Sequence, residues 1–307
     1  MNIYLPIAEM SMNIFNLIGL GGIVGFLSGL LGVSGGFLLT PSLILMGIPS
    51  SIAVASQSAN VIATSTTGSM THIKKNNVDY KMAFIVLFGG IIGSSVGVWV
   101  FTILNESSQL DLTVKILYMI FLTVIGLLMF WELGIAKIRK FKKIVVIKKL
   151  HKHNFMHKLP LRTKFKKSRL YISSLFPMII GMVVGFLSAL MGIGGGFIMV
   201  PAMIYLLGMH TSVVVGTTLF QGIFVSINAT FWQASINHTV DFLLAFILII
   251  GGVVGARIGS SVSSKLPADR LRIILASIVI FVSIALFVDL IMPPKEIYSI
   301  VSPKGAW

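Results

Sequence analysis

The chain of 307 residues contains no cysteine and very few acidic side chains. Without a thiol there can be no disulfide, no thiolate metal site and no cysteine nucleophile. Asp and Glu together number nine, and all charged residues make up 11% of the chain. A typical soluble domain has a charged fraction of about 25%. The composition therefore excludes an ordinary water-soluble protein.

Other signals are missing as well. The sequence has no HExxH motif and no acidic pair within an apolar run, so it lacks residue clusters that an intramembrane enzyme would use. It has no GxxxxGK[ST] loop, so a P-loop cannot supply ATP energy. No Lys or Arg precedes the first apolar run, which predicts that this run is retained in the mature protein. We therefore expect no enzyme and no cofactor.

What the chain has instead is apolar sequence, at 56% of all residues. Eight runs are long enough to cross a bilayer as helices: 12–33, 50–71, 81–104, 113–133, 172–193, 211–235, 239–262 and 271–292. Two shorter runs, 35–48 and 195–208, begin at glycines and end at Gly47 and Gly208. We interpret these as half-helices or re-entrant segments. The pattern predicts an all-α polytopic membrane protein.

The same membrane-type segment occurs twice, 160 residues apart. GFLSGLLGVSGGFLLTP at 25–41 returns as GFLSALMGIGGGFIMVP at 185–201, with ten of 17 positions identical. Such a repeat indicates that a half-protein was duplicated, so we expect two homologous halves and a ligand site between them. The predicted bounds are 1–136 for the first transmembrane repeat, 137–170 for a basic connector, 171–292 for the second repeat and 293–307 for a tail. Each half has about four long helices and one short one.

The charge distribution predicts the topology. Of the 24 Lys and Arg residues, 14 lie between Lys137 and Arg169, where there is no acidic residue. This favours a cytoplasmic connector that can lie against anionic lipid, rather than a nucleic-acid site, although a partner-binding site is the alternative. Lys74, Lys75 and Lys81 mark one loop as internal, whereas the equivalent loop at 237–241 lacks basic residues. The halves are therefore predicted to have inverted topology, with both termini external.

Inverted halves need an odd number of crossings in each half. Five segments per half satisfy this condition if the short segment crosses the membrane. They also satisfy it if the short segment pairs with the first helix as a re-entrant hairpin. The sequence leaves both arrangements open.

The glycines at 32–36 and 192–196 carry the functional prediction. At least three glycines within five residues predict that the backbone leaves helical geometry inside the membrane, which survives only where it lines a polar cavity. Helices starting at about Phe37 and Phe197 would then present unpaired amides and positive dipole ends to an anion. The alternative is that these glycines only allow close helix packing. We expect close packing for the small-residue stripes Gly21, Gly25, Gly29, Gly181, Gly185, Ala189, Gly89, Gly93, Gly97, Gly251, Gly255 and Gly259.

The helices after the short segments offer a polar lining. One side of run 50–71 carries Ser56, Gln57, Asn60 and Thr64, and run 211–235 carries Thr217, Thr218, Gln221 and Asn228. Asn60 and Gln221 fall at equivalent positions, so we favour them as ligand contacts. The hydroxyls can serve equally as interhelical hydrogen bonds. Arg257 could pair with an oxyanion or extend to the membrane interface.

The paired glycine-rich segments, the GTT turn at 216–218 and the GARIG run at 255–259 resemble the sulfite exporter TauE/SafE family of membrane permeases. The resemblance covers about residues 15–290, apart from the connector. It implies a carrier of eight or nine predicted helices in the bacterial inner membrane. Its substrate would be sulfite, sulfoacetate or a related sulfur-containing or organic anion.

We therefore predict secondary transport of a small anion by alternating access. Coupling to a proton or another ion is an open part of this prediction. The residues predicted to contact the anion are Ser34, Gly35, Gly36, Asn60, Gly194, Gly195, Gly196, Thr217, Thr218, Gln221 and Arg257. The alternative function is a membrane scaffold that recruits partners or lipid through the connector.

Overall fold

A computed structural model describes residues 2–31, 35–141, 162–165, 167–168, 170–263 and 268–291. Its described part contains ten α-helices, five in each half, which confirms the predicted all-α architecture. The first half comprises α1 (Ile14–Leu31), α2 (Gly36–Leu45), α3 (Ser50–Lys74), α4 (Tyr80–Glu106) and α5 (Leu110–Phe141). The second comprises α6 (Leu175–Met191), α7 (Gly196–Tyr205), α8 (Thr211–Trp232), α9 (Phe242–Ser263) and α10 (Ala268–Ile291), with a π-helical turn at Gln233–Asn237 after α8.

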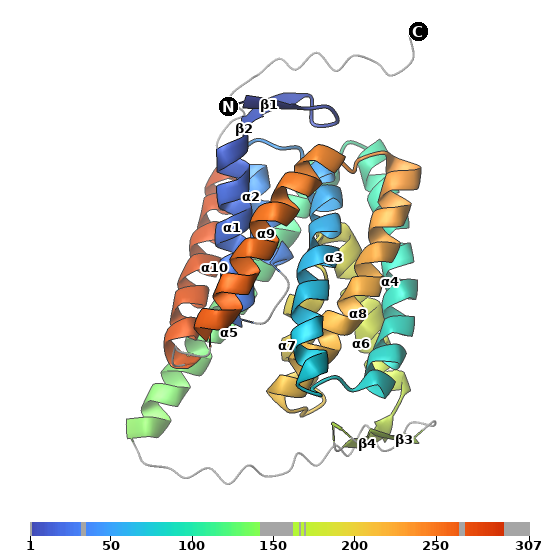
Figure 1. Cartoon of the computed structure of the whole chain (residues 1–307), viewed down its shortest axis with the longest axis vertical. Helices are drawn as coiled ribbons and strands as arrows, with labels where there is room; N and C mark the ends of the chain where they lie inside the picture. The colour runs from blue at the N-terminus through green and yellow to red at the C-terminus, as the bar shows by residue number, and fades with distance from the viewer. Residues whose placement is uncertain are drawn as a thin grey trace.

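A small antiparallel hairpin precedes the helices of each half. β1 (Asn2–Leu5) pairs with β2 (Met10–Asn13), and β3 (Arg162–Phe165) pairs with β4 (Leu170–Ser173). The two hairpins occupy equivalent positions 160 residues apart and lie at opposite ends of the helical bundle (Figure 1). The sequence did not reveal them. β3 falls within the range predicted as a connector, while residues 142–161 of that connector lie outside the described residues, as does the tail at 292–307.

Each short helix turns back toward the end of the bundle at which its half began. At the end of α2, a Cβ on Gly47 would lie 3.8 Å from Met10 Cε in β2. After α7, Leu207 packs in one buried cluster with Phe165 and Ile172 of the β3–β4 hairpin. The pairs α1–α2 and α6–α7 therefore have the hairpin shape of re-entrant segments, and α3, α4 and α5 then run from end to end (Figure 1). This corresponds to the second of the two arrangements that the sequence left open.

The two halves interlock through glycine. α1 packs on α9, and α4 packs on α6. A Cβ on Gly25 would lie 2.3 Å from the carbonyl oxygen of Gly252, and a Cβ on Gly185 would lie 2.3 Å from that of Gly90. Backbones this close leave no room for a side chain, so the prediction that the small-residue stripes serve close packing is confirmed. The structure adds that the contacts join one half to the other.

The helices α3 and α8 lie between the halves. They pack against each other, and α3 also contacts α9 while α8 contacts α4. Their many Ser, Thr, Asn and Gln side chains are mostly buried there. Most polar side chains of these two helices are thereby kept away from the outer surface.

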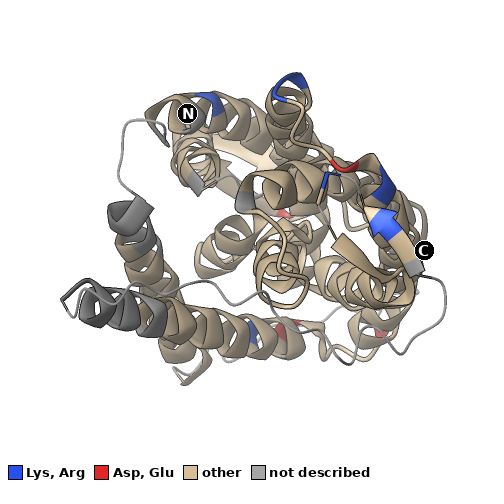
Figure 2. Cartoon of the chain, turned by 90° about the horizontal axis from the view of Figure 1, so that it is seen from below, with Lys and Arg blue, Asp and Glu red and all other residues tan. Residues whose placement is uncertain are grey.

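The outer surface is apolar. Phe84 and Trp99 of α4, Phe242 of α9 and Phe281 of α10 are all more than half exposed. Seen from below, the described Lys, Arg, Asp and Glu residues are few (Figure 2). In the described residues, four stretches are long and apolar enough to cross a membrane: Tyr80–Glu106, Leu110–Phe130, Ser212–Asn237 and Phe242–Gly259. The protein is a multi-pass membrane protein.

The other predicted spans differ for physical reasons. α1, α6 and the Ala276–Ile291 part of α10 are apolar but shorter, and α1 and α6 belong to the re-entrant pairs. α3 has 25 residues but carries the polar lining, so it is not among the apolar spans of the described chain. Its polar groups can cross a membrane only because other helices surround them.

Candidate functional site

The two short helices start next to each other. They begin at Gly36 and Gly196, one residue before the predicted starts at Phe37 and Phe197. The rings of Phe37 and Phe197 stack with centroids 3.8 Å apart and planes 5° from parallel. Both rings are buried. The positive ends of two helix dipoles are therefore brought together inside the protein, as the sequence predicted.

The break in the second half departs from helical geometry. Gly192 closes α6 with a φ of 67°, and Gly194 and Gly195 follow with φ values of 75° and 69°. This left-handed region is costly for residues with a Cβ, so glycine is required at each position. The N–H of Gly196 donates a 2.8 Å hydrogen bond to the carbonyl of Gly194. The predicted interruption of the helix is confirmed here.

The break in the first half is different in its described part. Gly35 has φ −70° and ψ −2°, and its carbonyl accepts hydrogen bonds from the N–H groups of Leu38 and Leu39. Its counterpart Gly195 is left-handed. Ser34, another predicted contact, lies outside the described residues together with residues 32 and 33.

The glycines of the breaks also pack tightly. A Cβ on Gly36 would lie 2.6 Å from the carbonyl oxygens of both Gly192 and Ile193, and a Cβ on Gly194 would lie 2.3 Å from Val61 Cγ1 of α3. Close packing is thus one reason for these glycines. It does not account for the three positive φ values, which packing alone does not require. The role of the breaks in anion binding stays a prediction.

Next to the breaks lie buried polar atoms with unmet hydrogen bonds. Among the described residues, Gln57 Nε2, Asn60 Oδ1 and Ser65 Oγ of α3 have no partner, nor have Gln221 Oε1 and Ser226 Oγ of α8. The Asn60 amide nitrogen donates to Gln57 Oε1 at 3.2 Å. A buried polar group without a partner costs about 1–3 kcal/mol. Such atoms mark a place where a polar ligand or water would be stabilised.

Asn60 and Gln221 have equivalent surroundings. A Cβ on Gly252 of α9 would lie 2.9 Å from Asn60 Oδ1, and a Cβ on Gly90 of α4 would lie 3.4 Å from Gln221 Oε1. A Cβ on Gly195 would lie 3.9 Å from Gln221 Nε2. The structure therefore brings Gln221 to the second break and matches each amide with a glycine of the opposite half.

Ser65 belongs to the same region. A Cβ on Gly222 of α8 would lie 3.3 Å from the carbonyl oxygen of Gly194 and 3.8 Å from Ser65 Oγ. Hydroxyl, amide and broken backbone thus meet where α3, α8 and the second break converge. We call Gln57, Asn60, Ser65 and Gln221 the amide cluster. Ser65 was not singled out from the sequence, because one serine in a polar helix carries no distinguishing signal.

Thr217 and Thr218 already have partners. Thr217 Oγ1 accepts a 3.1 Å hydrogen bond from the N–H of Asp79, and Thr218 Oγ1 donates to the carbonyl of Val215 at 3.1 Å. Asn228 is similar, because its amide donates to Ser94 Oγ and Ser95 Oγ at 2.9 and 3.1 Å. The contacts of Thr217 and Asn228 fit the interhelical role that the sequence left open, whereas the hydrogen bond of Thr218 lies within α8. A direct contact of either threonine with an anion stays a prediction.

The structure does not bring Arg257 to the amide cluster. Its side chain is exposed on α9, whereas Asn60 and Gln221 are buried. Exposure at the outer surface favours the reading in which Arg257 extends to the membrane interface.

Two stretches fit the GxSxG spacing of serine hydrolases, at 32–36 and 93–97. That motif works in a sharp turn between a strand and a helix. Residues 93–97 lie inside α4, where Ser95 accepts a hydrogen bond from Asn228. In the part of the chain that the structure describes, no group of three His, Cys, Asp or Glu residues could hold a metal ion.

Two buried aspartates were missed by the sequence reasoning. Asp79 precedes α4 and accepts from the N–H of Met82 at 3.3 Å, and Asp241 precedes α9 and accepts from the N–H of Leu244 at 3.0 Å. Both are helix N-caps and are almost fully buried. Their equal placement before equivalent helices, 162 residues apart, is the signal that could have identified them.

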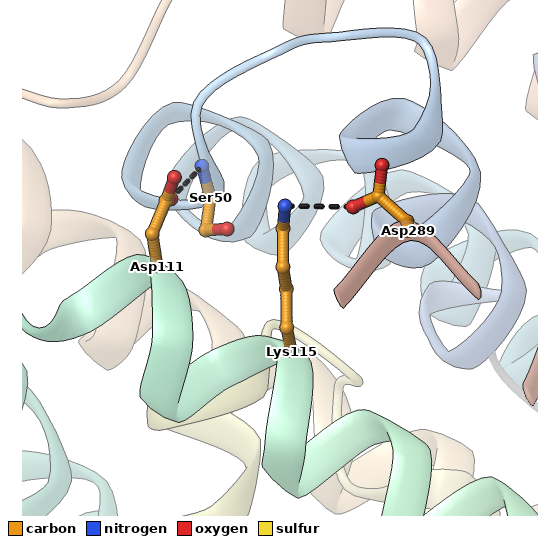
Figure 3. Close-up of polar contacts among 4 residues, drawn as sticks. All are labelled: Ser50, Asp111, Lys115 and Asp289. Carbon is orange, nitrogen blue, oxygen red and sulfur yellow. Dashed lines mark hydrogen bonds and ion pairs between the residues drawn. The ribbon is translucent and has the colours of Figure 1, made fainter. Parts of the chain in front are cut away.

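Near one end of the bundle, α5 is tied to its neighbours by charge (Figure 3). Asp111 Oδ1 accepts a 2.9 Å hydrogen bond from the N–H of Ser50, at the start of α3. One turn further along, Lys115 Nζ lies 2.7 Å from Asp289 Oδ2 of α10. The first contact ties α5 to the start of α3, and the second joins α5 to its counterpart α10.

Comparison with known proteins identifies relatives over nearly the whole chain. Residues 17–286 match the family model described as sulfite exporter TauE/SafE. The probable membrane transporter protein YjnA of Bacillus subtilis (strain 168) is 29% identical over 268 residues, which cover 86% of this chain and 96% of that protein. YunE of the same organism, also a probable membrane transporter protein, is 28% identical over 288 residues, or 91% and 98% of the two chains.

A probable membrane transporter protein of Xylella fastidiosa (strain 9a5c) is 28% identical over 256 residues, covering 82% of this chain and 86% of the relative. The comparison with solved structures gave no significant match.

Proposed function

The chain belongs to the sulfite exporter TauE/SafE family, and we propose that it is a secondary transporter that moves a small anion across the bacterial inner membrane. The names of its relatives support a membrane transporter. The observation that carries the finer proposal is the amide cluster, with its unpartnered buried atoms beside the start of α7.

The chemistry of the cluster suits an oxyanion. Gln57 Nε2 and Ser65 Oγ are available donors. In the first turn of α7, the N–H groups of Gly196 and Met199 already donate to the carbonyls of Gly194 and Gly195, which leaves those of Phe197 and Ile198 without an acceptor in their own helix. A helix start also carries about half a positive charge. Neutral donors bind an anion less tightly than a buried cation would. This suits a carrier, because a carrier must also release its substrate. Sulfite or another sulfur-containing or organic anion fits this description.

Alternating access is supported by the arrangement of the two halves. Equivalent hairpins lie at opposite ends of the bundle, and the amide cluster lies on helices between them (Figure 1). In such repeats, rocking of one half against the other exposes a central site to each side in turn. Because the sequence lacks a P-loop, we assign the driving force to an ion gradient or to the gradient of the anion itself.

We also propose that the end bearing the β3–β4 hairpin is cytoplasmic. Lys74, Lys75 and Lys81 lie at this end, and Lys164 and Lys167 add to them from the hairpin. Figure 2 views the molecule from this side. Basic residues near membrane helices favour the cytoplasmic side, where they can also contact anionic lipid.

The test is transport in proteoliposomes with Asn60→Ala plus Gln221→Ala. Loss of a hydrogen bond to a charged ligand costs about 1.5–3 kcal/mol, so we expect flux at low substrate concentration to fall at least about tenfold. Thr66→Ala is the matched control on α3, because its hydroxyl donates to the carbonyl of Ile62 in its own helix. Wild-type flux in the double variant would exclude the two amides from the mechanism.

The scaffold alternative rests on the connector, most of which lies outside the described residues. Deleting residues 142–161 separates the two functions. If the protein is a carrier, the deletion variant keeps its anion flux. If it is a scaffold, the full-length protein shows no flux, and the deletion removes its recruiting activity.

A further inference from the structure

The same set of hydrogen bonds occurs at both ends of the molecule. At each end it centres on a buried aspartate, Asp79 before α4 or Asp241 before α9. Only one oxygen of each carboxylate is used to cap its own helix. The other oxygen and the backbone N–H make contacts with the opposite half, and these contacts carry the inference.

The second carboxylate oxygen holds a hairpin of the opposite half. Asp79 Oδ2 accepts from Ser168 N–H at 3.0 Å and from Ser168 Oγ at 2.6 Å. Asp241 Oδ2 accepts from Ile7 N–H at 3.0 Å and from Ala8 N–H at 3.4 Å. Ser168 and Ala8 occupy equivalent positions in the two hairpin turns. Hydrogen bonds to a charged acceptor are about twice as strong as neutral ones.

The aspartate backbone contacts the helix that bears the amide. Asp79 N–H donates to Thr217 Oγ1 at 3.1 Å, and Asp241 N–H donates to Ser56 Oγ at 2.9 Å. Thr217 lies four residues before Gln221, and Ser56 lies four residues before Asn60, so each pair shares one helix face. Each aspartate therefore connects a hairpin to a helix of the amide cluster.

The hairpins close the ends of the fold. Leu5 and Ala8 are buried in one cluster with Ile48 and Leu244, which belong to opposite halves. Phe165 and Ile172 are buried in another with Met82 and Leu207, again from opposite halves. A two-stranded hairpin is only marginally stable by itself. Its position therefore depends on these apolar contacts and on the aspartate.

We propose that Asp79 and Asp241 are positioning residues for transport, each holding one hairpin closed over one end of the protein and linking that hairpin to the amide cluster. Release of the contact at one end opens that end alone. In this structure both contacts are made. The proposal rests on the proposed transport function, but its test does not depend on the identity of the substrate.

The lack of native cysteine allows a direct test of access. Ser65→Cys places a thiol in the amide cluster, and a charged, membrane-impermeant thiol reagent is applied to right-side-out and inverted vesicles. With Asp79→Asn we expect labelling to rise from the β3–β4 end only. The expected rise is about tenfold, because this is the change in an equilibrium that loss of one hydrogen bond to a charged group produces. With Asp241→Asn we expect the same rise from the β1–β2 end only. Equal changes from both sides, or none, would overturn the proposal.

Two mirrored variants keep the aspartates and guard against misfolding. Ser168→Ala gives the second hairpin the residue that the first has naturally at Ala8, and removes one bond to Asp79. Ala8→Ser adds a donor beside Asp241. We expect labelling to rise from the β3–β4 end in the first variant and to fall from the β1–β2 end in the second. If labelling from each end is unchanged in both variants, the proposal is overturned.

A further readout separates positioning from general destabilisation. Hydrogen exchange should quicken at Ser168 in Asp79→Asn and at Ile7 and Ala8 in Asp241→Asn, with little change at the other hairpin. Ser168→Ala should add nothing in the Asp79→Asn background, because the two act through one contact. Uniformly faster exchange at both hairpins would contradict the proposal. Labelling could change at one end only while none of the tested anions is transported. That result would count against the proposed substrate class and not against the role of the aspartates.

Discussion

The rings of Phe37 and Phe197 lie face to face, 3.8 Å apart, at the first turns of the two short helices. The two residues are equivalent in the duplicated sequence, so each stacks against its own counterpart in the other half. Phe121 of α5 packs against Phe197 in a T-shaped arrangement, with ring centroids 5.9 Å apart. This stack is the point at which the two breaks are held together.

Substituting either ring should therefore destabilise the protein strongly. Phe37→Ala or Phe197→Ala removes a buried aromatic side chain, for which the expected loss is about 3–5 kcal/mol. Thermal unfolding in detergent measures the effect. Phe84→Ala is the control, since this ring is 58% exposed on α4 and should cost much less. Equal losses for the buried and the exposed rings would contradict the assignment.

Adding a single methyl group where the two halves touch should also destabilise the protein. A Cβ on Gly29 would lie 2.2 Å from the carbonyl oxygen of Ala256, and backbone cannot move aside as a side chain can. We expect Gly29→Ala to cost about 1–3 kcal/mol or more. Gly19 lies in the same helix with nothing within 4 Å of its Cβ position, so Gly19→Ala should stabilise the helix by about 0.5–1 kcal/mol. Opposite signs in the two unfolding curves are the expected outcome.

Breaking the Lys115–Asp289 ion pair should destabilise the protein less. Its side chains are 23% and 39% exposed, so replacing either partner alone should cost about 1 kcal/mol or less. Exchanging the charges, as Lys115→Asp with Asp289→Lys, should restore most of the loss. Unfolding of the two single variants and the exchanged pair measures the coupling. An exchanged pair no more stable than the single variants would show that the contact contributes nothing.

Ligand binding should stabilise the folded protein in proportion to occupancy. At an anion concentration of 100 times Kd the expected gain is about 2.7 kcal/mol. We would measure thermal shifts with sulfite, thiosulfate, sulfate, sulfoacetate and short carboxylates. The anion that binds should lose its effect in the Asn60→Ala plus Gln221→Ala variant and keep it in Thr66→Ala. A shift of equal size in the double variant would place the anion elsewhere.

The sequence predicted the features that repeat at a fixed spacing. Ten identities in 17 residues identified the breaks around Gly36 and Gly196, and the short helices begin there. The equivalence of Asn60 and Gln221 was visible for the same reason. Each amide faces an equivalent glycine, which no single-helix pattern could have predicted.

Features that depend on chain direction or on distant contacts were not predictable. Hydrophobic length does not distinguish a short crossing from a helix that turns back, so the re-entrant form of α1–α2 required the contact between Gly47 and Met10. The hairpins were missed because four-residue strands carry little apolar alternation. The partners of Asp79 lie 89 and 138 residues away, which local sequence does not encode.

The exchange of helices between the halves bears on the origin of the chain. With α1 seated on α9 and α6 on α4, neither half has a finished surface of its own. An ancestral half-length polypeptide would have needed a second copy packed against it before it could fold completely. Fusion of two genes would then have joined partners that were already interdependent.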